Sequence, residues 1–299
     1  MSSPFPFPPR PDLPPERIAT AAFALRYEDV AQDGRMTAIA FPPALGWTVW
    51  QQLLDGHPAE RALAAAGVVP ILSRLTIVGT DATIRVDAPA TATGGYQLAR
   101  KDVDGAVDKL FLNMWVDVTG AAGRMMPPQG PGPQVTAGTM FAEHTFTRLF
   151  APPDARKVTR LDGPGLPGVP DAIYDAPAST TAMNPPDGAD LLDAEYHPDP
   201  VVTAFGLDHT DSNQHVNSLV YPRLFAEAAL RRLAELERPR RLLIRALDIA
   251  YRKPSFAGDR VRIHTRLFRQ GDRLGAAGFV ADVADPAARP RACARFVFG

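Results

Sequence analysis

The sequence has one cysteine, no long apolar run and almost no net charge, and each of these excludes a class of protein. Cys293 is the only cysteine among 299 residues, so neither an internal disulfide nor a cysteine-based metal site can form. No apolar run approaches the roughly 20 residues of a membrane-spanning helix. A basic segment followed by an apolar one is also absent, so we expect no signal peptide, no membrane partner and a cytoplasmic protein.

The remaining composition is that of an ordinary globular protein. Hydrophobic residues make up 45% of the chain and charged residues 22%, which provides ample material for a core. The net charge of −1 creates no overall field that would attract nucleic acid. Metal-ligand spacings, phosphate-binding glycine loops and nucleotide fingerprints are absent from the sequence, so we predict no metal site and no cofactor.

Two regions rich in proline divide the chain. The first, PFPFPPRPDLPP, predicts an extended arm over 1–17, laid against the body by Phe5 and Phe7. The second, over 151–195, also carries several glycines and predicts an irregular connection across a surface. Because so long a link is unusual inside one compact domain, we place it between two domains, 18–150 and 196–299.

The C-terminal domain shows the clearest periodicity. Two rows of apolar residues at i, i+4 spacing predict a helix over 220–237, with Asn217 or Ser218 as its N-cap. Alternating patterns after it predict strands, with a hairpin turn at Gly271-Asp272; the strands are expected at 243–251, 261–267, 274–283 and 292–298. This order predicts an antiparallel sheet wrapped around one helix, an α+β fold.

The N-terminal domain repeats the same order at an offset of 180 residues, where Phe41-Pro42 corresponds to Tyr221-Pro222. A helix is expected at 45–54 and strands at 75–78, 83–87, 110–118 and 135–150. The shared order of elements indicates a duplication.

The chemistry is concentrated in the segment before the C-terminal helix. Asp211, Asn213 and His215 place a carboxylate, an amide and an imidazole two residues apart. A loop at a helix start brings such side chains beside backbone N–H groups that carry partial positive charge. Hydrolysis of a thioester needs this combination, because one group activates water or attacks the carbonyl while donors stabilise the oxyanion. The alternative is a purely structural role, in which these residues form a polar turn that only caps the helix.

The pattern D-x-N-x-H-V-N followed by a tyrosine resembles the hotdog thioesterases, and most closely the plant and bacterial acyl-ACP thioesterases. The resemblance implies a double hotdog, in which each repeat is an antiparallel sheet around one long helix and the second repeat carries the site. Asp211, Asn213 and His215 match the family's catalytic loop, and Val216, Asn217 and Tyr221 match the positions that follow.

The chain departs from the family downstream. The segment from Tyr251 to Ser255 resembles one in which a glutamate and a cysteine follow a tyrosine-arginine pair, but Pro254 and Ser255 stand at those places here. The glutamate that belongs to the family's full mechanism is therefore missing from this chain. The residues expected to contact substrate are Asn217, Tyr221, Glu227, Tyr251 and Ser255, although Glu227 is as well explained as a partnered helix residue and Ser255 as a turn hydroxyl.

The first repeat lacks this chemistry. Ala31, Asp33, Arg35 and Thr37 stand opposite Asp211, Asn213, His215 and Asn217, and no histidine lies nearby. We therefore expect it to support the fold and bind the acyl chain. His57, His144, His197 and His209 show no evident partners in the sequence, and His264 is expected on an exposed strand surface.

These observations predict an acyl-thioester hydrolase that acts on acyl-ACP or acyl-CoA in fatty-acid or polyketide-type metabolism. Two alternatives stay open: an enoyl-thioester hydratase or dehydratase of double-hotdog type, and a non-catalytic acyl-binding or assembly protein. Hydratases place the histidine five residues after the aspartate, against four here. Ten Lys or Arg residues between Arg231 and Arg262 predict a face for an acidic acyl carrier protein, or simply a solvated surface. A homodimer of double hotdogs is a further expectation.

Overall fold

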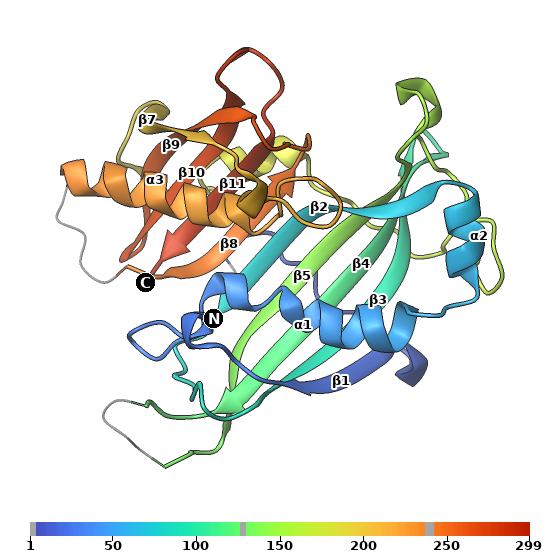
Figure 1. Cartoon of the computed structure of the whole chain (residues 1–299), viewed down its shortest axis with the longest axis horizontal. Helices are drawn as coiled ribbons and strands as arrows, with labels where there is room; N and C mark the ends of the chain where they lie inside the picture. Colours follow the sequence, from blue (N-terminus) through green and yellow to red (C-terminus); the bar gives the residue numbers. More distant parts are fainter. Residues whose placement is uncertain (1–3, 126–129, 237–241) are drawn as a thin grey trace. The chain divides into compact units, whose positions relative to one another are not determined.

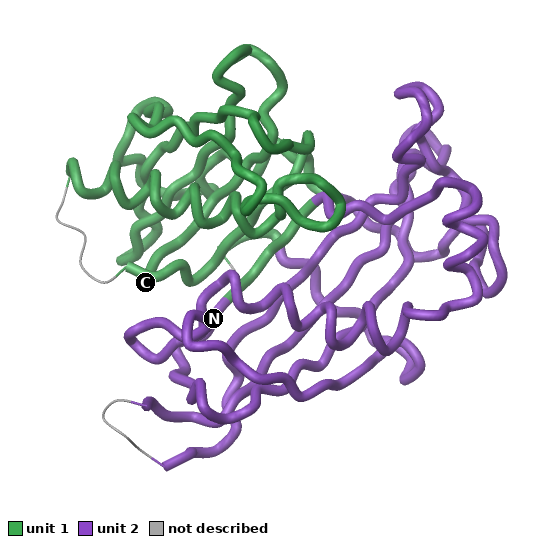
Figure 2. The backbone as a smooth tube through the Cα atoms, viewed as in Figure 1, with its two compact units in different colours: residues 1–6, 74–78, 177–299 green, residues 7–73, 79–176 purple. Residues whose placement is uncertain are grey.

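The computed structural model describes residues 4–125, 130–236 and 242–299, which divide into two compact units (Figure 2). Unit 2 comprises 7–73 and 79–176, and unit 1 comprises the first six residues with 74–78 and 177–299. The residues of β2 are therefore divided between the units, since Arg74–Val78 in its second half belong to unit 1. The domain boundaries predicted after residues 17, 150 and 195 were placed by the sequence repeats and do not coincide with the limits of these units. They stay a prediction.

Unit 2 contains an antiparallel sheet with the strand order β1-β3-β4-β5-β2 (Figure 1). Helical turns connect β1 to β2 and lie against one face of the sheet. The elements, in chain order, are η1 (Pro15–Arg17), β1 (Ile18–Phe23), η2 (Tyr27–Asp29), η3 (Ala38–Ala40), α1 (Pro43–Leu45), the π-helical η4 (Gly46–Leu54), α2 (Ala59–Ala65), β2 (Val68–Gly79), β3 (Ala90–Val103), β4 (Ala106–Ala121), β5 (Gln134–Arg148) and η5 (Pro153–Ala155).

Unit 1 repeats this arrangement. Its sheet runs from Arg74–Val78 of β2 through β8, β11 and β10 to β9, and β9 pairs with both β6 and β7. The helix α3 lies across one face of these strands (Figure 1). The elements are η6 (Ser179–Met183), β6 (Asp190–Leu191), β7 (His197–Ala204), η7 (Leu207–His209), α3 (Val220–Leu236), β8 (Ile244–Tyr251), β9 (Arg260–Gln270), β10 (Arg273–Asp282) and β11 (Ala292–Phe298).

The two strand orders are equivalent, because β1, β3, β4, β5 and β2 correspond to β7, β9, β10, β11 and β8. Each unit therefore has an antiparallel sheet with a helical segment on one face, which confirms the predicted α+β double hotdog. The helix α3 packs through its i, i+4 row, and the ring of Phe225 lies 5.6 Å from that of Phe296 on β11. In unit 2, η4 approaches the sheet so closely that a Cβ on Gly94 would collide with Thr48.

Most predicted elements are present, and the differences have simple causes. The strand expected at 83–87 is wrong: Ile84 makes only an isolated bridge to Ala122, and the next residues turn so that Arg85 binds Asp87. Its apolar and polar residues alternate as in a strand, but no neighbouring strand among the described residues forms a ladder of hydrogen bonds with it. Four strands were not predicted, namely β1, β3, β6 and β7.

The N-terminal arm lies on the sheets, as predicted from its two phenylalanines. Phe5 is buried in unit 1 in a cluster with Phe268 and Val297. In unit 2, the ring of Phe7 lies 6.4 Å from that of Phe141, and the indole N–H of Trp115 donates to the carbonyl of Pro8 at 2.8 Å. The arm therefore covers sheet residues that would otherwise face water.

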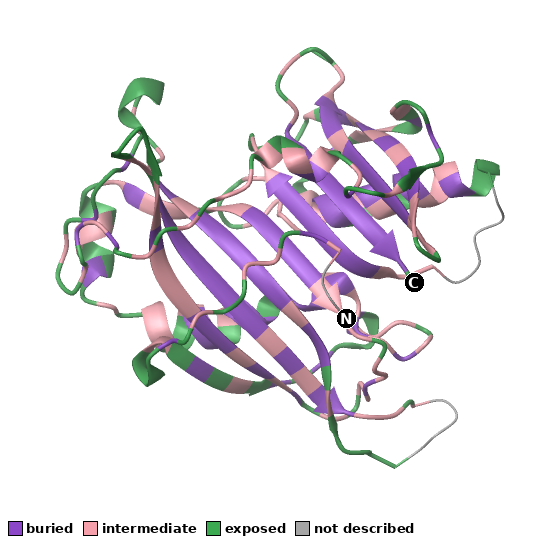
Figure 3. Ribbon diagram, turned by 180° about the vertical axis from the view of Figure 1, so that it is seen from behind, coloured by how far each residue is buried: buried purple, intermediate pink, exposed green. Residues whose placement is uncertain are grey.

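The long connection between the repeats covers the sheets in the same way. Ala182 and Met183 of η6 pack on Ala250 and Cys293 in unit 1. In unit 2, the ring of Tyr174 lies 5.2 Å from that of Phe111, and its hydroxyl donates to Glu143 at 2.9 Å. Seen from behind, most residues of the strands are buried, and extended segments of the chain cross over them (Figure 3).

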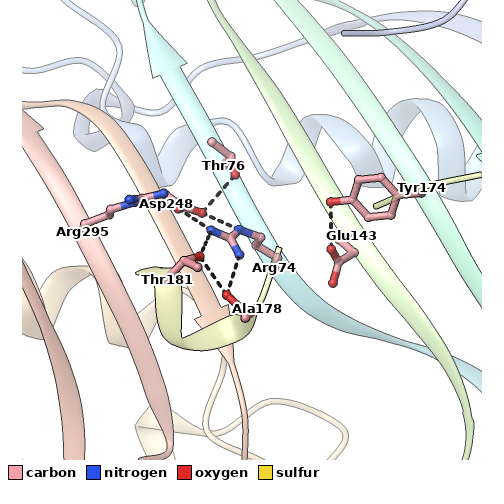
Figure 4. Close-up of polar contacts among 8 residues, drawn as sticks. All are labelled: Arg74, Thr76, Glu143, Tyr174, Ala178, Thr181, Asp248 and Arg295. Atoms are coloured by element: carbon pink, nitrogen blue, oxygen red, sulfur yellow. Dashed lines mark hydrogen bonds and ion pairs between the residues drawn. The ribbon is translucent and has the colours of Figure 1, made fainter. Parts of the chain in front are cut away.

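A cluster of buried charges lies where β2 pairs with β8 (Figure 4). The carboxylate of Asp248 is fully buried and accepts hydrogen bonds from Arg74 at 2.6 and 2.7 Å and from Arg295 at 2.9 Å. Thr76 donates to the same carboxylate at 3.3 Å, and Arg74 also donates to Thr181 of η6 at 3.3 Å. One carboxylate thus joins β2, β8, β11 and, through Arg74, the connection between the repeats.

Substituting Asp248 by alanine should destabilise the protein strongly. The change leaves the buried guanidinium groups of Arg74 and Arg295 without their carboxylate, which costs about 3–5 kcal/mol in comparable cases. Urea denaturation would measure the loss. The matched control, Asp162→Ala, removes the exposed partner of Arg160 and should leave the midpoint almost unchanged. Equal midpoints for the two variants would contradict the role assigned to the cluster.

His144 is a buried titratable group in unit 2. Its ring lies edge-on to Trp50 of η4 at 5.5 Å, and its Nδ1 atom has no partner among the described residues. Burial lowers the pKa of His144 from 6.5 to about 4, so the folded protein holds this imidazole neutral at physiological pH.

Lowering the pH should therefore weaken the fold through His144. Between pH 6.5 and 4 the unfolded chain binds a proton at this residue and the folded protein does not. The free energy of unfolding is therefore highest above pH 6.5, and it decreases by roughly 3 kcal/mol as the pH falls to 4. His144→Leu should flatten the pH dependence of the unfolding free energy across the window. Met140→Leu on the same strand should keep the wild-type slope, and an identical slope in all three proteins would refute the assignment.

Candidate active site

The predicted catalytic residues lie on one tight turn between η7 and α3 in unit 1. Thr210 and Val216 form an antiparallel bridge that closes the turn. Within it, the N–H of Asp211 donates to the carbonyl of His215 at 3.0 Å, and the N–H of Gln214 donates to the carbonyl of Asp211 at 2.9 Å. The backbone therefore holds Asp211 and His215 across from each other.

The Asp211 carboxylate has a local structural role as well as its predicted chemical one. It accepts the backbone N–H of Asn213 at 2.9 Å, which is the hydrogen bond of an Asx-turn. Asp211 is half-buried and Asn213 is exposed. In the described part of the chain, no hydrogen bond joins the side chains of Asp211, Asn213 and His215 to one another, so the turn brings them together without pairing them.

His215 borders an exposed aromatic side chain. Its ring lies 5.2 Å from that of Phe256 in an edge-on arrangement, and Phe256 is 46% exposed. The imidazole is thus half-buried with an apolar neighbour on one side. Phe256 was not predicted from the sequence, because nothing in its local pattern indicates that it reaches the loop.

The helix start supplies fewer free N–H groups than its sequence suggests. The N–H of Val216 donates to the carbonyl of Ser255 at 2.8 Å, and that of Asn217 donates to the carbonyl of His209 at 2.9 Å. Leu219 donates to the side-chain oxygen of Asn217 at 2.9 Å, which confirms Asn217 as the cap. Of the four N–H groups from Val216 to Leu219, only that of Ser218 has no partner among the described residues, so it alone is available to a carbonyl oxygen.

Three of the residues expected to contact substrate form the base of the loop. Tyr221 is buried, and burial raises the pKa of its hydroxyl, which meets the hydroxyl of Ser255. Tyr251 donates its hydroxyl to the carbonyl of Ser218 at 3.0 Å, and burial of that hydroxyl raises its pKa. Ser255 is fully buried. These contacts attach the loop to β8 and to the turn that follows it, whereas substrate contact by these residues stays a prediction.

Glu227 lies on the exposed surface of α3. Its side chain is 60% exposed and lies 3.7 Å from the guanidinium of Arg231, one helical turn further on. Arg231 also binds the buried carboxylate of Asp199 at 2.5 and 2.9 Å. Within the described ranges no hydrogen bond or ion pair links Glu227 to the loop.

The first repeat contains the same turn without the same chemistry. The N–H of Ala31 donates to the carbonyl of Arg35 at 2.8 Å, and that of Gly34 donates to the carbonyl of Ala31 at 2.9 Å. These bonds match those of Asp211, His215 and Gln214 at the predicted offset. Ala31 offers no carboxylate, and Arg35 is bound to Asp33. The predicted correspondence between the two loops is confirmed.

The equivalent residues Gly34 and Gln214 have positive φ angles of 86° and 64°. A glycine adopts this left-handed conformation freely, whereas a side chain such as that of glutamine makes it less favourable. The candidate site thus carries backbone strain that the first repeat avoids.

Several histidines have partners that the sequence did not reveal. His209 accepts the N–H of Gly206 at 3.0 Å, His57 accepts that of Ala59 at 3.2 Å, and His197 lies 3.4 Å from the carboxylate of Asp193. The expectation for His264 was wrong: its ring is half-buried and stacks on Phe279 at 4.8 Å. Burial, and then the charge of Arg262, lowers the pKa of His264.

The residues most clearly missed by the sequence analysis are Arg291 and Asp259. Arg291 is buried and donates to Asp259 at 2.6 Å, in the turn next to the loop. Long-range contacts of this kind leave no local motif. In the arginine-rich segment, Arg232 binds Asp193 at 2.6 Å and is therefore already paired, and Arg240 and Arg241 lie outside the described residues.

No group of three or more histidine, cysteine or carboxylate side chains in the described ranges could hold a metal ion. The helices in those ranges are all too short or too polar to cross a bilayer.

Comparison with protein-family models and with curated protein sequences finds no match. Solved structures do match, over 94% of this chain. A protein described as an oleoyl thioesterase from Lactobacillus plantarum has a TM-score of 0.59 at 13% identity over 94% of its length. An acyl-ACP thioesterase from Bacteroides thetaiotaomicron has 0.56 at 16% over 98%, and a 12:0-ACP thioesterase from Umbellularia californica has 0.56 at 14% over 97%. These similarities confirm the predicted double-hotdog fold.

Replacing Gln214 with glycine should stabilise the protein. Glycine removes the cost of a left-handed side-chain residue, worth roughly 0.5–1 kcal/mol after the extra entropy of the unfolded chain is included. Gln214→Val should have the opposite effect, because a β-branched residue tolerates this conformation worst. Chemical denaturation would measure both. Ser212→Gly serves as the control, because Ser212 lies in the same turn without a positive φ, and this change should not stabilise the protein. If Gln214→Gly were less stable than the wild type, the backbone strain assigned to Gln214 would be contradicted.

Proposed function

We propose that this protein hydrolyses acyl thioesters carried by acyl carrier protein or coenzyme A, in fatty-acid or polyketide-type metabolism, at the turn from Asp211 to His215. One observation carries the proposal: a carboxylate, a carboxamide and an imidazole share a five-residue turn, and three residues further along the chain the N–H of Ser218 has no partner among the described residues. The solved structures with the same fold include thioesterases, which agrees with this chemistry.

In the proposed reaction, Asp211 acts as the general base or as the nucleophile. As a base, its carboxylate removes a proton from a water molecule whose oxygen attacks the thioester carbonyl carbon. Asn213 positions the water or the carbonyl. The oxyanion that forms accepts the N–H of Ser218, at a helix start where the partial positive charge favours it. Collapse then breaks the carbon–sulfur bond. His215 transfers to the departing sulfur the proton that Asp211 took from the water, which leaves a free acid and a thiol and returns both side chains to their starting states.

A non-catalytic acyl-binding role is the second candidate, and two observations favour it. Pro254 occupies the position where the related segment has an acid. The Asp211 carboxylate also already accepts a backbone N–H and makes no hydrogen bond to the His215 ring in the described part of the chain. A panel of acyl-CoA and acyl-carrier-protein thioesters separates the candidates, because hydrolysis releases a free thiol and an acid, whereas binding alone leaves the thioester intact.

Asp211→Asn should abolish most hydrolysis and hardly change stability. The amide oxygen still accepts the N–H of Asn213, so the turn is kept, but the charge and basicity are lost; general-base help is typically worth 10²–10⁴-fold in rate. Thiol release and thermal unfolding would be measured together. Asp33→Asn in the first repeat is the matched control and should leave the rate unchanged. Full activity in Asp211→Asn would exclude the proposed mechanism.

A further inference from the structure

The buried side chain of Arg291 joins the turn after β8 to the sheet of unit 1. This residue is 5% exposed and lies directly before β11. Its Nη1 group donates to the carbonyl of Pro254 at 2.8 Å, to the hydroxyl of Ser255 at 3.4 Å and to the carboxylate of Asp259 at 2.6 Å. One guanidinium nitrogen thus contacts both ends of the turn.

The other Nη group anchors Arg291 to the sheet. It donates to the carboxylate of Asp282 at 2.5 Å, and this hydrogen bond holds the pKa of Asp282 below its usual value. The backbone N–H of Arg291 donates to the carbonyl of Val280 at 2.9 Å. The guanidinium of Arg291 therefore binds the sheet through one nitrogen and the turn after β8 through the other.

The turn after β8 also contacts the candidate catalytic loop, from Asp211 to His215, at two points. The carbonyl of Ser255 accepts the N–H of Val216, the residue directly after His215. The carboxylate of Asp259 accepts the N–H of Phe256 at 2.9 Å, and the ring of Phe256 lies against that of His215. The turn after β8 therefore fixes the imidazole of His215 in two ways: through the backbone hydrogen bond at Val216 and through the contact between the rings of His215 and Phe256.

We propose that Arg291 is a positioning residue for His215: by holding Pro254, Ser255 and Asp259, it sets the turn that places the imidazole. The inference rests on the proposed function for its catalytic consequence, although the placement itself can be measured without any reaction. It also assigns a role to the segment in which Pro254 replaces an acid, because the carbonyl of that proline is one of the acceptors of Arg291.

Arg291→Lys tests the proposal in the full-length protein. A lysine keeps the charge but has one nitrogen, so it cannot hold Asp282 and both ends of the turn together. With octanoyl-CoA as the probe, we expect kcat per folded molecule to fall roughly 10–100-fold, as expected for a small displacement of a reacting group, with a smaller change in KM. Exchange of the Val216 amide hydrogen should become at least about tenfold faster, since its hydrogen bond to Ser255 is loosened.

Arg295→Lys is the matched control, because Arg295 is a similarly buried arginine bound to a buried carboxylate in the same unit. It should leave kcat per folded molecule and Val216 exchange at their wild-type values. If Arg291→Lys behaves like this control in both measurements, Arg291 is merely structural and the proposal is overturned. If Arg291→Lys does not fold, Asp282→Asn, which weakens only the anchor of Arg291, should move Val216 exchange in the same direction, and unchanged exchange there would also overturn it.

The two proposals can fail separately. A wild-type protein that hydrolyses none of the thioesters in the panel would exclude the proposed function. Faster exchange at Val216 in Arg291→Lys would still support the placement of the loop by Arg291, and unchanged exchange would exclude it.

Discussion

The structure depends on covering the sheet faces that its helices leave open. In each unit a helical segment occupies one face, so the opposite face must be shielded by some other part of the chain. Here the proline-rich arm and the connection between the repeats provide that cover. Proline suits the role because it has no backbone N–H, and an extended segment laid on a sheet would otherwise bury N–H groups without partners. The composition that marks these regions as irregular is therefore also what lets them lie on the sheets.

Asp248 shows how much this cover depends on polar contacts as well as apolar ones. Its carboxylate stands on the covered face of β8 and is neutralised by two arginines from neighbouring strands. Arg74 then reaches Thr181 in the covering segment. Since isolated buried charges are costly, these residues are favourable only when strands and cover are all in place. Burial of Phe5 beneath Arg295, whose guanidinium lies 5.0 Å from the ring, links the arm to the same cluster.

Sequence periodicity predicted the elements whose two faces differ in polarity. The helix α3 and the strand β9, whose buried and half-buried residues alternate, have such faces, whereas β11 is buried along its whole length. The strand β7 was missed because Pro198 and Pro200 argue against a strand, yet it pairs only with β9 and so lies at an edge where proline is tolerated. The strand β3 was missed because Gly94 and Gly95 weaken its pattern, although η4 packs so closely that a side chain at Gly94 would not fit.

The candidate site divides in the same way between local and long-range information. Asp211, Asn213, His215 and the capping Asn217 lie within seven residues, so their arrangement follows from the sequence of one turn. Phe256 contacts that turn directly, and Arg291 and Asp259 hold the segment that carries Phe256, an arrangement that exists only because β8 and β11 are neighbours in the sheet. No spacing rule connects residues that meet through strand pairing, and the support of a site therefore has to be found in three dimensions.

The duplicated turn explains how one repeat could keep its shape while its side chains changed. The hydrogen bonds that define the turn join backbone atoms in both repeats, at Ala31 and Gly34 as at Asp211 and Gln214. Because backbone groups do not depend on residue type, the first repeat retains the path of the chain into its helix with an alanine and an arginine at the key places. The second repeat keeps a glutamine in a left-handed conformation where glycine would be more favourable. Backbone strain of this kind is common at functional sites, so its place next to His215 agrees with the function proposed for this turn.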